Sequence, residues 1–406
     1  MTGVANSRAS PPRLHPDVLK LGLVSFLTDL SSEIIFSVFA VFFTTVAGAT
    51  HALLGLVEGL ADFSASSLNY LAGWMSDRSG TRKPLAIAGY AFSTLAKSIL
   101  LVTATITGLA AFRVIERLGK GFRGPPRDAW LSSMADPVRL GFSFGVHKAL
   151  DKAGAVAGPL LAWAVLWWLG ESPDAYRALF WIAFVPALIS LAVLARVREQ
   201  RGTPRPREDL RQNWRTLSPG FKRFLVPAGI FALAYYSLAF LLVRAHESGF
   251  SVAQVVLLYA LFNATCVLAA PLAGLLGDRI GRTRVVALGY AIYGLINLGL
   301  VFATSRSALI VLFACYGVFY AIEEAQSKAF IADLEPERRA SAIGLYQFVT
   351  GTIYVPASLL AGALWTASAT LAFTLAAALS LVAIATLAVL RPAAGSTLSP
   401  PPGTLP

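Results

Sequence analysis

Charged residues are scarce in this chain of 406 residues. Asp, Glu, Lys and Arg make up 14% of it and hydrophobic residues 56%, whereas a soluble globular domain is roughly 25% charged. This balance excludes an ordinary soluble fold and predicts an integral membrane protein of the all-α, polytopic class.

Cysteine and histidine are also rare, with 2 and 4 copies. Cys266 and Cys315 lie in separate apolar runs, away from any cluster of metal-ligating residues, so a disulfide framework or a zinc site is not expected and both are interpreted as packing residues. The sequence also lacks a nucleophile paired with a base and a phosphate-binding loop. We therefore predict no enzymatic activity, no metal and no cofactor.

Acidic residues are too few to balance the basic ones, and the net charge is +12. A nucleic-acid partner would require these charges to gather on one folded surface, but here they fall in short loops between apolar runs. We predict no nucleic-acid partner and interpret the excess as a signal of membrane topology. Residues 1–16 lack the apolar region of a signal peptide, so the first apolar run is expected to stay as a membrane span.

Twelve apolar runs are long enough to cross a bilayer, given that a hydrocarbon core about 30 Å thick requires roughly 20 helical residues. The predicted spans are 17–45, 52–73, 84–107, 109–134, 141–169, 176–197, 220–243, 251–277, 284–305, 307–332, 339–366 and 368–391.

Lys and Arg collect in the loops that follow the even-numbered spans, as at Arg78, Arg82 and Lys83. By the positive-inside rule both termini are cytoplasmic, and the expected location is the cytoplasmic (inner) membrane. The predicted divisions are a cytoplasmic tail over 1–16, a first bundle over 17–197, a basic linker over 198–219, a second bundle over 220–391 and a disordered cytoplasmic tail over 392–406. The linker is either a solvated tether or a segment that binds anionic lipid headgroups.

One loop pattern occurs twice, which indicates that one half of the chain is a copy of the other. The first copy reads Gly73-Trp-Met-Ser-Asp77-Arg78-Ser-Gly80-Thr-Arg82-Lys83, and the second reads Gly274-Leu-Leu-Gly-Asp278-Arg279-Ile-Gly281-Arg282-Thr-Arg284. This duplicated signature resembles that of the major facilitator superfamily of secondary transporters. The resemblance implies two pseudo-symmetric six-helix bundles around a cavity, alternating access, a small-molecule substrate and a monomer.

The resemblance also implies a conformational latch, in which the loop Asp caps a helix of the opposite half and holds the outward-facing state. The residues that match it are Gly73, Asp77, Arg78, Gly80, Arg82, Asp278, Arg279, Gly281 and Arg282. Thr81 stands where the family pattern has Arg, so the first copy is expected to form a weaker latch than the second.

Four acids lie inside the first two spans, with Asp29 four residues before Glu33 and Glu58 four residues before Asp62. That spacing places each pair on one helix face. A charge at the bilayer centre costs about 2.5–3.5 kcal/mol on insertion scales, so these faces must meet water or a partner. Structural pairing is the alternative to substrate or proton binding, above all for Glu58.

The fourth span carries a run of charge that lipid would not tolerate, so it must line a cavity or pack against acids. Its charged residues are Arg113, Glu116, Arg117, Lys120, Arg123, Arg127 and Asp128. Arg117-Leu-Gly-Lys120-Gly121 resembles the superfamily's Arg-x-x-Gln-Gly motif, with Lys120 in place of Gln. The resemblance assigns proton coupling to Arg117, with Arg113 as the alternative.

The fifth span contains Gly145, Gly154, Gly158 and Pro159, at the spacing of the superfamily's antiporter motif. Generic helix packing by small residues is the alternative explanation. His147 and Asp151 lie in the same span. The imidazole exchanges protons near neutral pH, so His147 is either a proton carrier or a structural residue.

The second half carries less charge in its spans, with Glu323 and Glu324 as the exception. Adjacent residues of a helix point about 100° apart, so we expect at most one of the two acids to face the cavity, and Lys328 to pair with Glu324. The acids and bases of the first half nearly cancel, so net charge does not predict the substrate.

The favoured function is proton-coupled export of a small organic molecule, and the alternative is a proton-coupled symporter that imports an organic anion. Export is implied by the segments Phe26 to Glu33, Gly119 to Ala129 and His147 to Gly154, which resemble a bacterial branch labelled drug or siderophore exporters.

Overall fold

The computed structural model describes residues 15–134, 140–199, 217–303, 305–336 and 339–392. Regular structure in these ranges is helical, without strands. Most of the predicted tails 1–16 and 392–406 and of the predicted linker 198–219 falls outside the described residues, so these assignments remain predictions.

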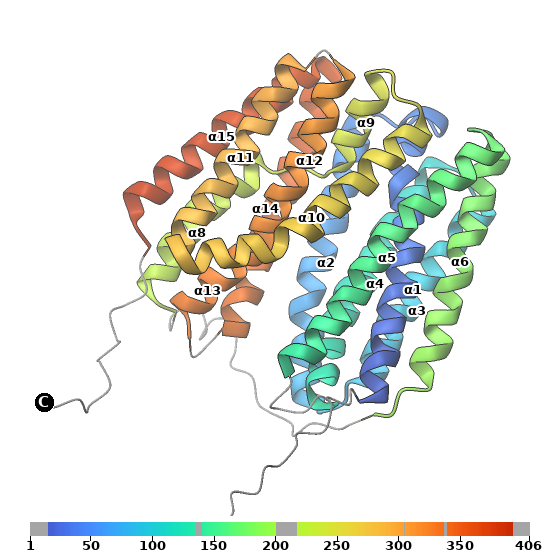
Figure 1. Ribbon diagram of the computed structural model, residues 1–406, viewed down its shortest axis with the longest axis horizontal. Coiled ribbons are helices and arrows are strands. Elements are labelled where there is room, and N and C mark those ends of the chain that lie inside the picture. The colour runs from blue at the N-terminus through green and yellow to red at the C-terminus, as the bar shows by residue number, and fades with distance from the viewer. Residues whose placement is uncertain (1–14, 135–139, 200–216, 304, 337–338, 393–406) are drawn as a thin grey trace, which may run out of the picture.

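The first half forms six helical rods (Figure 1). They are α1 (Pro16–Val41) continued by the π-helix η1 (Phe42–Val46), α2 (His51–Ser79), α3 (Lys83–Val102), α4 (Ile106–Met134), α5 (Leu140–Leu169) and α6 (Pro173–Ala195).

The second half also forms six rods, two of them interrupted. They are α8 (Pro219–Ala234) with α9 (Ala239–Glu247), α10 (Val252–Ile280), α11 (Arg282–Phe302), α12 (Arg306–Ile322) with the π-helix η3 (Glu323–Ser327) and α13 (Lys328–Leu334), α14 (Arg339–Ala367), and α15 (Ala369–Leu390). The predicted seventh span is thus broken between α8 and α9, a feature that hydrophobic length alone does not reveal.

Serine and threonine start many of these helices. Each side-chain oxygen accepts a hydrogen bond from a backbone N–H of the first turn, which satisfies one of the donors that a helix start leaves unpaired. The capping residues are Thr50, Ser172, Ser218, Ser251 and Ser305.

Ten of the described rods are long and apolar enough to cross a membrane. The other two are α2 and α4, which carry the charged residues singled out above. Each has 29 residues, a length of about 43 Å at 1.5 Å per residue, so each is long enough to span. The predicted twelve-span, all-α polytopic fold is therefore confirmed.

The rods group into two bundles that lie side by side (Figure 1). In the first bundle α1 packs against α5 and α6, and α4 packs against α2 and α3. In the second bundle α10 packs against α12, and α15 packs against α8 and α11. The bundles meet mainly where α2 lies along α14 and α5 along α10, so the charged helix α2 is covered by protein on two sides.

Glycines allow α2 and α14 to approach closely. A Cβ on Gly55 would lie 2.1 Å from the carbonyl oxygen of Ser358, and one on Gly59 would lie 2.9 Å from Cα of Val355. Any larger residue at either position would push the two bundles apart. The duplicated loop motif has a separate need for glycine, because Gly80 and Gly281 end their helices at φ 66° and 89°, where other residues are strained.

Candidate transport cavity

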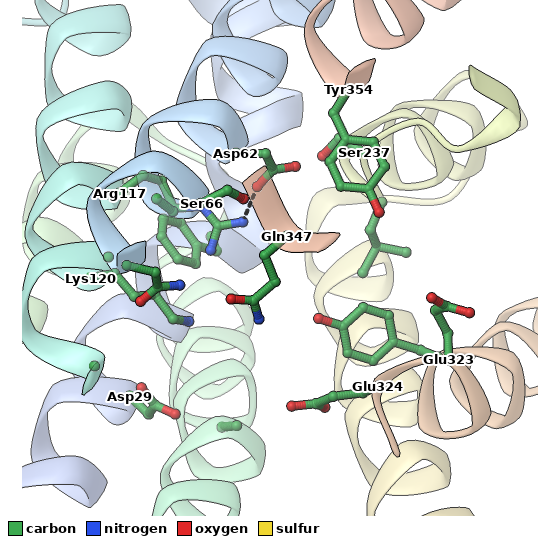
Figure 2. Close-up of a pocket in the computed structure, with 18 of the residues that line it drawn as sticks. Asp29, Asp62, Ser66, Arg117, Lys120, Ser237, Glu323, Glu324, Gln347 and Tyr354 are labelled. Atoms are coloured by element: carbon green, nitrogen blue, oxygen red, sulfur yellow. Dashed lines mark hydrogen bonds and ion pairs between the residues drawn. The ribbon is translucent and has the colours of Figure 1, made fainter. Parts of the chain in front are cut away.

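A cavity of about 830 Å³ lies between the two bundles (Figure 2). Sites for small organic ligands range over roughly 300–1,000 Å³, so a drug-sized molecule would fit. Most of the charged residues singled out in the sequence line this cavity. They are Asp29, Glu33, Asp62, Arg113, Arg117, Lys120, Arg123, Arg127, Asp128, Asp151, Glu323, Glu324 and Lys328, together with Glu58.

Arg113 and Glu58 form a two-pronged ion pair at the deep end of the cavity. Arg113 Nε lies 2.5 Å from Glu58 Oε1 and Nη2 lies 2.7 Å from Oε2. Both residues are buried, at 7% and 1% exposure. Ser237 of the second bundle donates a 2.7 Å hydrogen bond to the same carboxylate. Glu58 is therefore paired structurally, the alternative that the sequence favoured for it, and the pair also joins the two bundles.

One turn along, Arg117 pairs with Asp62 through Nη2 and Oδ1 (Figure 2). Both side chains are partly exposed to the cavity. The i,i+4 spacing of the two acids on α2 thus matches the i,i+4 spacing of the two arginines on α4. The two helices carry a ladder of opposite charges, which explains how both can lie at bilayer depth.

Asp29 and Lys120 differ from these pairs. Both line the cavity, yet neither makes a hydrogen bond or an ion pair within 4.0 Å among the described residues. Figure 2 shows both side chains on the wall formed by the first bundle. Glu33, one turn beyond Asp29, accepts a hydrogen bond from the hydroxyl of Tyr259 in the second bundle.

Arg127 and Asp151 are linked through Ser25 of α1. Arg127 Nη1 donates to Ser25 Oγ at 3.1 Å, and this hydroxyl donates to Asp151 at 3.0 Å. Arg127 also contacts Asp128 at 2.9 Å, and Lys148 contacts Asp151 at 2.9 Å. The sequence identified the charged residues but gave no signal for the serine that connects them.

The prediction that only one of Glu323 and Glu324 faces the cavity is wrong, since both line it (Figure 2). They begin the π-helix η3, whose wider turn departs from the α-helical spacing on which the prediction depended. Glu323 accepts hydrogen bonds of 2.9 Å from Ser327 and from Tyr346.

Glu324 contacts Lys328 at 4.0 Å, as the sequence predicted. It lies closer to Lys152, at 3.7 Å, and also contacts Lys148 at 4.0 Å. These two lysines belong to α5 of the first bundle, so Glu324 bridges the bundles.

His147 is buried, with 3% exposure, and is absent from the described lining of the cavity. Its Nε2 has no hydrogen-bond partner among the described residues. The structure therefore places His147 outside the cavity wall but still within electrostatic reach of Asp151 and Lys148.

Two of the three glycines of the antiporter-type motif hold α5 against α1. A Cβ on Gly154 would lie 2.4 Å from the carbonyl oxygen of Phe26, and one on Gly158 would lie 2.9 Å from that of Leu30. A Cβ on Gly145 would have nothing within 4 Å among the described residues. Pro159 lies inside α5, directly after Gly158.

In the second copy of the loop motif, Arg282 pairs with Asp333 at 2.9 Å and lies 3.7 Å from Asp278. The sequence did not predict Asp333, because it lies about 50 residues from the motif. In the first copy Arg78 lies over the ring of Trp74, with 5.1 Å to the centroid. The side chain of Asp77 is outside what the structure describes.

Contacts between the bundles close the cavity at the end where α2 begins. His51 Nε2 lies 3.1 Å from Glu247 Oε1, and the backbone N–H of Ala253 donates to Glu171 at 2.9 Å. The cavity lining instead extends toward the other ends of the helices, as at Gly73 and Lys328. This conformation is thus closed on one face of the molecule.

Twelve rods around a central cavity of paired charges define a multi-pass membrane transporter of small molecules. Residues 21–245 and 228–404 match the family model described as Major Facilitator Superfamily. The chain belongs to this superfamily, as the duplicated loop motif predicted, and is a transporter rather than an enzyme.

An uncharacterised MFS-type transporter of Methanocaldococcus jannaschii is 34% identical over 376 residues, covering 91% of this chain and 93% of the relative. A multidrug resistance protein B homologue of Mycobacterium tuberculosis is 29% identical over 225 residues, covering 54% of this chain and 40% of that protein. The crystal structure of a bacterial homologue of the human lysosomal transporter Spinster, inward-facing and occupied, has a TM-score of 0.72 at 17% identity. It covers 92% of this chain and 96% of its own and establishes similarity of fold.

Proposed function

We propose that this chain exports a small organic molecule in exchange for protons, by alternating access between its two bundles. The observation that carries the proposal is the cavity of about 830 Å³, whose walls hold carboxylates and cations at bilayer depth. Charges at this depth are tolerated where they face water or one another, and they are typical of ion and substrate pathways.

We infer that both termini are cytoplasmic, that the membrane is the cytoplasmic (inner) membrane and that the protein acts as a monomer. The conformation described above, closed where α2 begins, would then be the inward-facing state. The proposed residues for proton and substrate binding are Asp29, Glu33, Asp62, Arg113, Arg117 and Asp151, and the loop residues Asp278 and Arg282 with Asp333 would form the latch.

Two features favour export over import. The relative named a multidrug resistance protein aligns with 54% of this chain, and Gly154 and Gly158 of the antiporter-type motif pack directly on α1 beside Asp29. Import of an organic anion by proton symport remains the second candidate, since Lys120 lines the cavity without a partner among the described residues.

A growth screen of a deletion strain against toxic compounds and metabolites would identify a substrate for flux measurements. In proteoliposomes under an imposed pH gradient, the substrate should move against proton flow, and energised inside-out vesicles should accumulate it. Substrate movement without proton counterflow would contradict coupling. Loss of the substrate from the inside-out vesicles would instead favour the symporter.

The residue assignments are tested in the same assay. The Asp29→Asn and Arg117→Ala variants should lose transport and remain folded, as judged by thermal unfolding. Arg177→Gln is the matched control, because this arginine lies outside the cavity and is 80% exposed. Full transport by Arg117→Ala would remove Arg117 from the mechanism.

A further inference from the structure

The charges of the cavity are satisfied within the protein, with two exceptions. Among the described lining residues, every other acid and base takes part in an ion pair or a hydrogen bond. In the part of the chain that the structure describes, Asp29 and Lys120 alone have no such partner within 4.0 Å, and they do not pair with each other. One negative and one positive group are thus left for a ligand.

The positions of these two groups are fixed by close packing on either side. A Cβ on Gly119 would lie 2.6 Å from the carbonyl oxygen of Gly89, and one on Gly121 would lie 2.3 Å from that of Ala65. The residues that flank Lys120 are therefore held against α3 and α2, while the lysine itself points into the cavity (Figure 2). Gly154 likewise contacts α1 at Phe26 and Leu30, on either side of Asp29.

A ligand with a single charge would leave one of the two groups uncompensated. A cation would neutralise Asp29 but would leave the charge of Lys120 uncompensated. An anion would neutralise Lys120 but would leave the charge of Asp29 uncompensated. Asp29 and Lys120 are only partly exposed, and an uncompensated charge at bilayer depth is unfavourable. A ligand that carries both charges satisfies both groups, and the unfavourable alternatives provide selectivity.

We propose that the substrate of this cavity is a zwitterion, whose cationic group binds Asp29 and whose anionic group binds Lys120. The inference depends on the proposed transport function and adds the substrate class to it. On the opposite wall, beside the acids Glu323 and Glu324, the neutral side chains of Gln347 and Tyr354 face the cavity (Figure 2). Tyr320 is a further neutral residue of the lining. Aromatic faces suit an apolar or aromatic body on the ligand.

Matched sets of probes test this proposal with the full chain in lipid nanodiscs. The members of each set share one body and differ in charge. In the first set phenylalanine is the zwitterion, its amide is the cation and its N-acetyl derivative is the anion. The second set consists of the dipeptide Phe-Phe and the same two derivatives. We expect at least one zwitterion to bind about tenfold or more tightly than either of its derivatives. This factor corresponds to the free-energy contribution of one hydrogen bond to a charged group. Equal binding by a singly charged derivative, or failure of every zwitterion to bind, would overturn the proposal.

Two variants separate recognition of charge from a structural role. Asp29→Asn should lose the preference for the zwitterion over the anion, and Lys120→Gln should lose its preference over the cation, each by about tenfold. A structural role would weaken all three probes equally and would overturn the proposal. Asp174→Asn and Arg177→Gln are the matched controls, because both residues are exposed and outside the cavity.

Flux measurements distinguish failure of this inference from failure of the proposed function. If the variants shift charge preference as expected but no bound zwitterion moves in response to a pH gradient, proton-coupled export is contradicted and the charge preference stands. If the singly charged probes are exported against protons as fast as the zwitterion, export stands and the substrate class is wrong.

Discussion

The ion pair between Arg113 and Glu58 shows how single residues can hold charge at bilayer depth. The guanidinium meets both carboxylate oxygens at 2.5 and 2.7 Å and lies over the ring of Phe36, 4.2 Å from its centroid. Each of the two buried charges is therefore neutralised by the other. Removal of one partner is therefore far more costly than removal of both.

We predict that Arg113→Met destabilises the protein by about 3–5 kcal/mol, because the carboxylate of Glu58 loses its partner in a buried position. The double variant Glu58→Gln with Arg113→Met should recover part of this loss. Denaturant or thermal unfolding of the purified chain in detergent measures both. Arg177→Met serves as the control at an exposed arginine, with an expected change within about 0.5 kcal/mol. A double variant less stable than Arg113→Met would contradict this account of the pair.

At the scale of helices, the contact between α1 and α5 depends on two glycines of one motif. Gly154 and Gly158 contact the α1 backbone, whereas a Cβ on Gly145 would meet nothing within 4 Å in the part of the chain that the structure describes. In the absence of a hydrophobic force between helices in lipid, such close packing is a main source of association. The motif therefore has a structural role at two of its positions, beside any role in transport.

We predict that Gly154→Val lowers the stability of the protein by about 1–3 kcal/mol, the usual cost of overpacking. The new side chain would meet the carbonyl oxygen of Phe26, 2.4 Å from the Cβ position. Gly145→Val is the matched control on the same helix and should unfold at nearly the wild-type temperature. Equal unfolding temperatures for the two variants would show that α5 does not depend on this contact.

The sequence predicted the helices better than it predicted the partners of the charged side chains. Span length and the duplicated motif are local signals, and both were sufficient for twelve rods in two bundles. The break between α8 and α9 and the π-helical turn at Glu323 are departures from regular geometry inside predicted spans. Neither stretch contains the proline or glycine that usually marks a break in a helix.

The pairing of the charged residues could be determined only from the three-dimensional structure. Arg113 finds Glu58 across 55 residues of sequence, and Lys152 of α5 reaches Glu324 in the other bundle at 3.7 Å. Periodicity predicts which residues share a face, but not how one helix is rotated against another or at what depth they meet. For this reason the candidate residues could be named from the sequence while their partners, including Ser25 and Asp333, could not.

For the whole molecule, alternating access requires that contacts at the closed end be weak enough to break. His51 of α2 and Glu247 of α9 join the bundles there at 3.1 Å, and Trp365 donates to the same carboxylate at 3.3 Å. Both members of this contact are about a third exposed, at 28% and 36% of their side chains. Even a fully charged, partly exposed contact contributes at most about 1 kcal/mol, so this one can bias the conformation without locking it.

We predict that Glu247→Gln increases the population open at this end by up to about fivefold, the factor that corresponds to about 1 kcal/mol. Spin labels at Val46→Cys and Ala367→Cys, in a Cys266→Ala, Cys315→Ala background, should report a larger fraction of long distances. Asp174→Asn is the control, since among the described residues this acid forms its ion pair within its own bundle, with Arg177 at 3.7 Å. An unchanged distance distribution would mean that Glu247 does not help to close the cavity.

The central claim is that the cavity between the bundles is a wet pathway that opens in turn to each side of the membrane. The most direct test is the reaction of a membrane-impermeant thiol reagent with Gln347→Cys, whose side chain projects into the cavity (Figure 2), in a background without Cys266 and Cys315. The thiol should react from the cytoplasmic side at rest and from the opposite side under an imposed pH gradient with substrate. The thiol of Leu295→Cys, on the outer surface of the second bundle with 66% exposure, should react from neither side. Reaction of Gln347→Cys from one side alone under all conditions, or from neither side, would contradict the account.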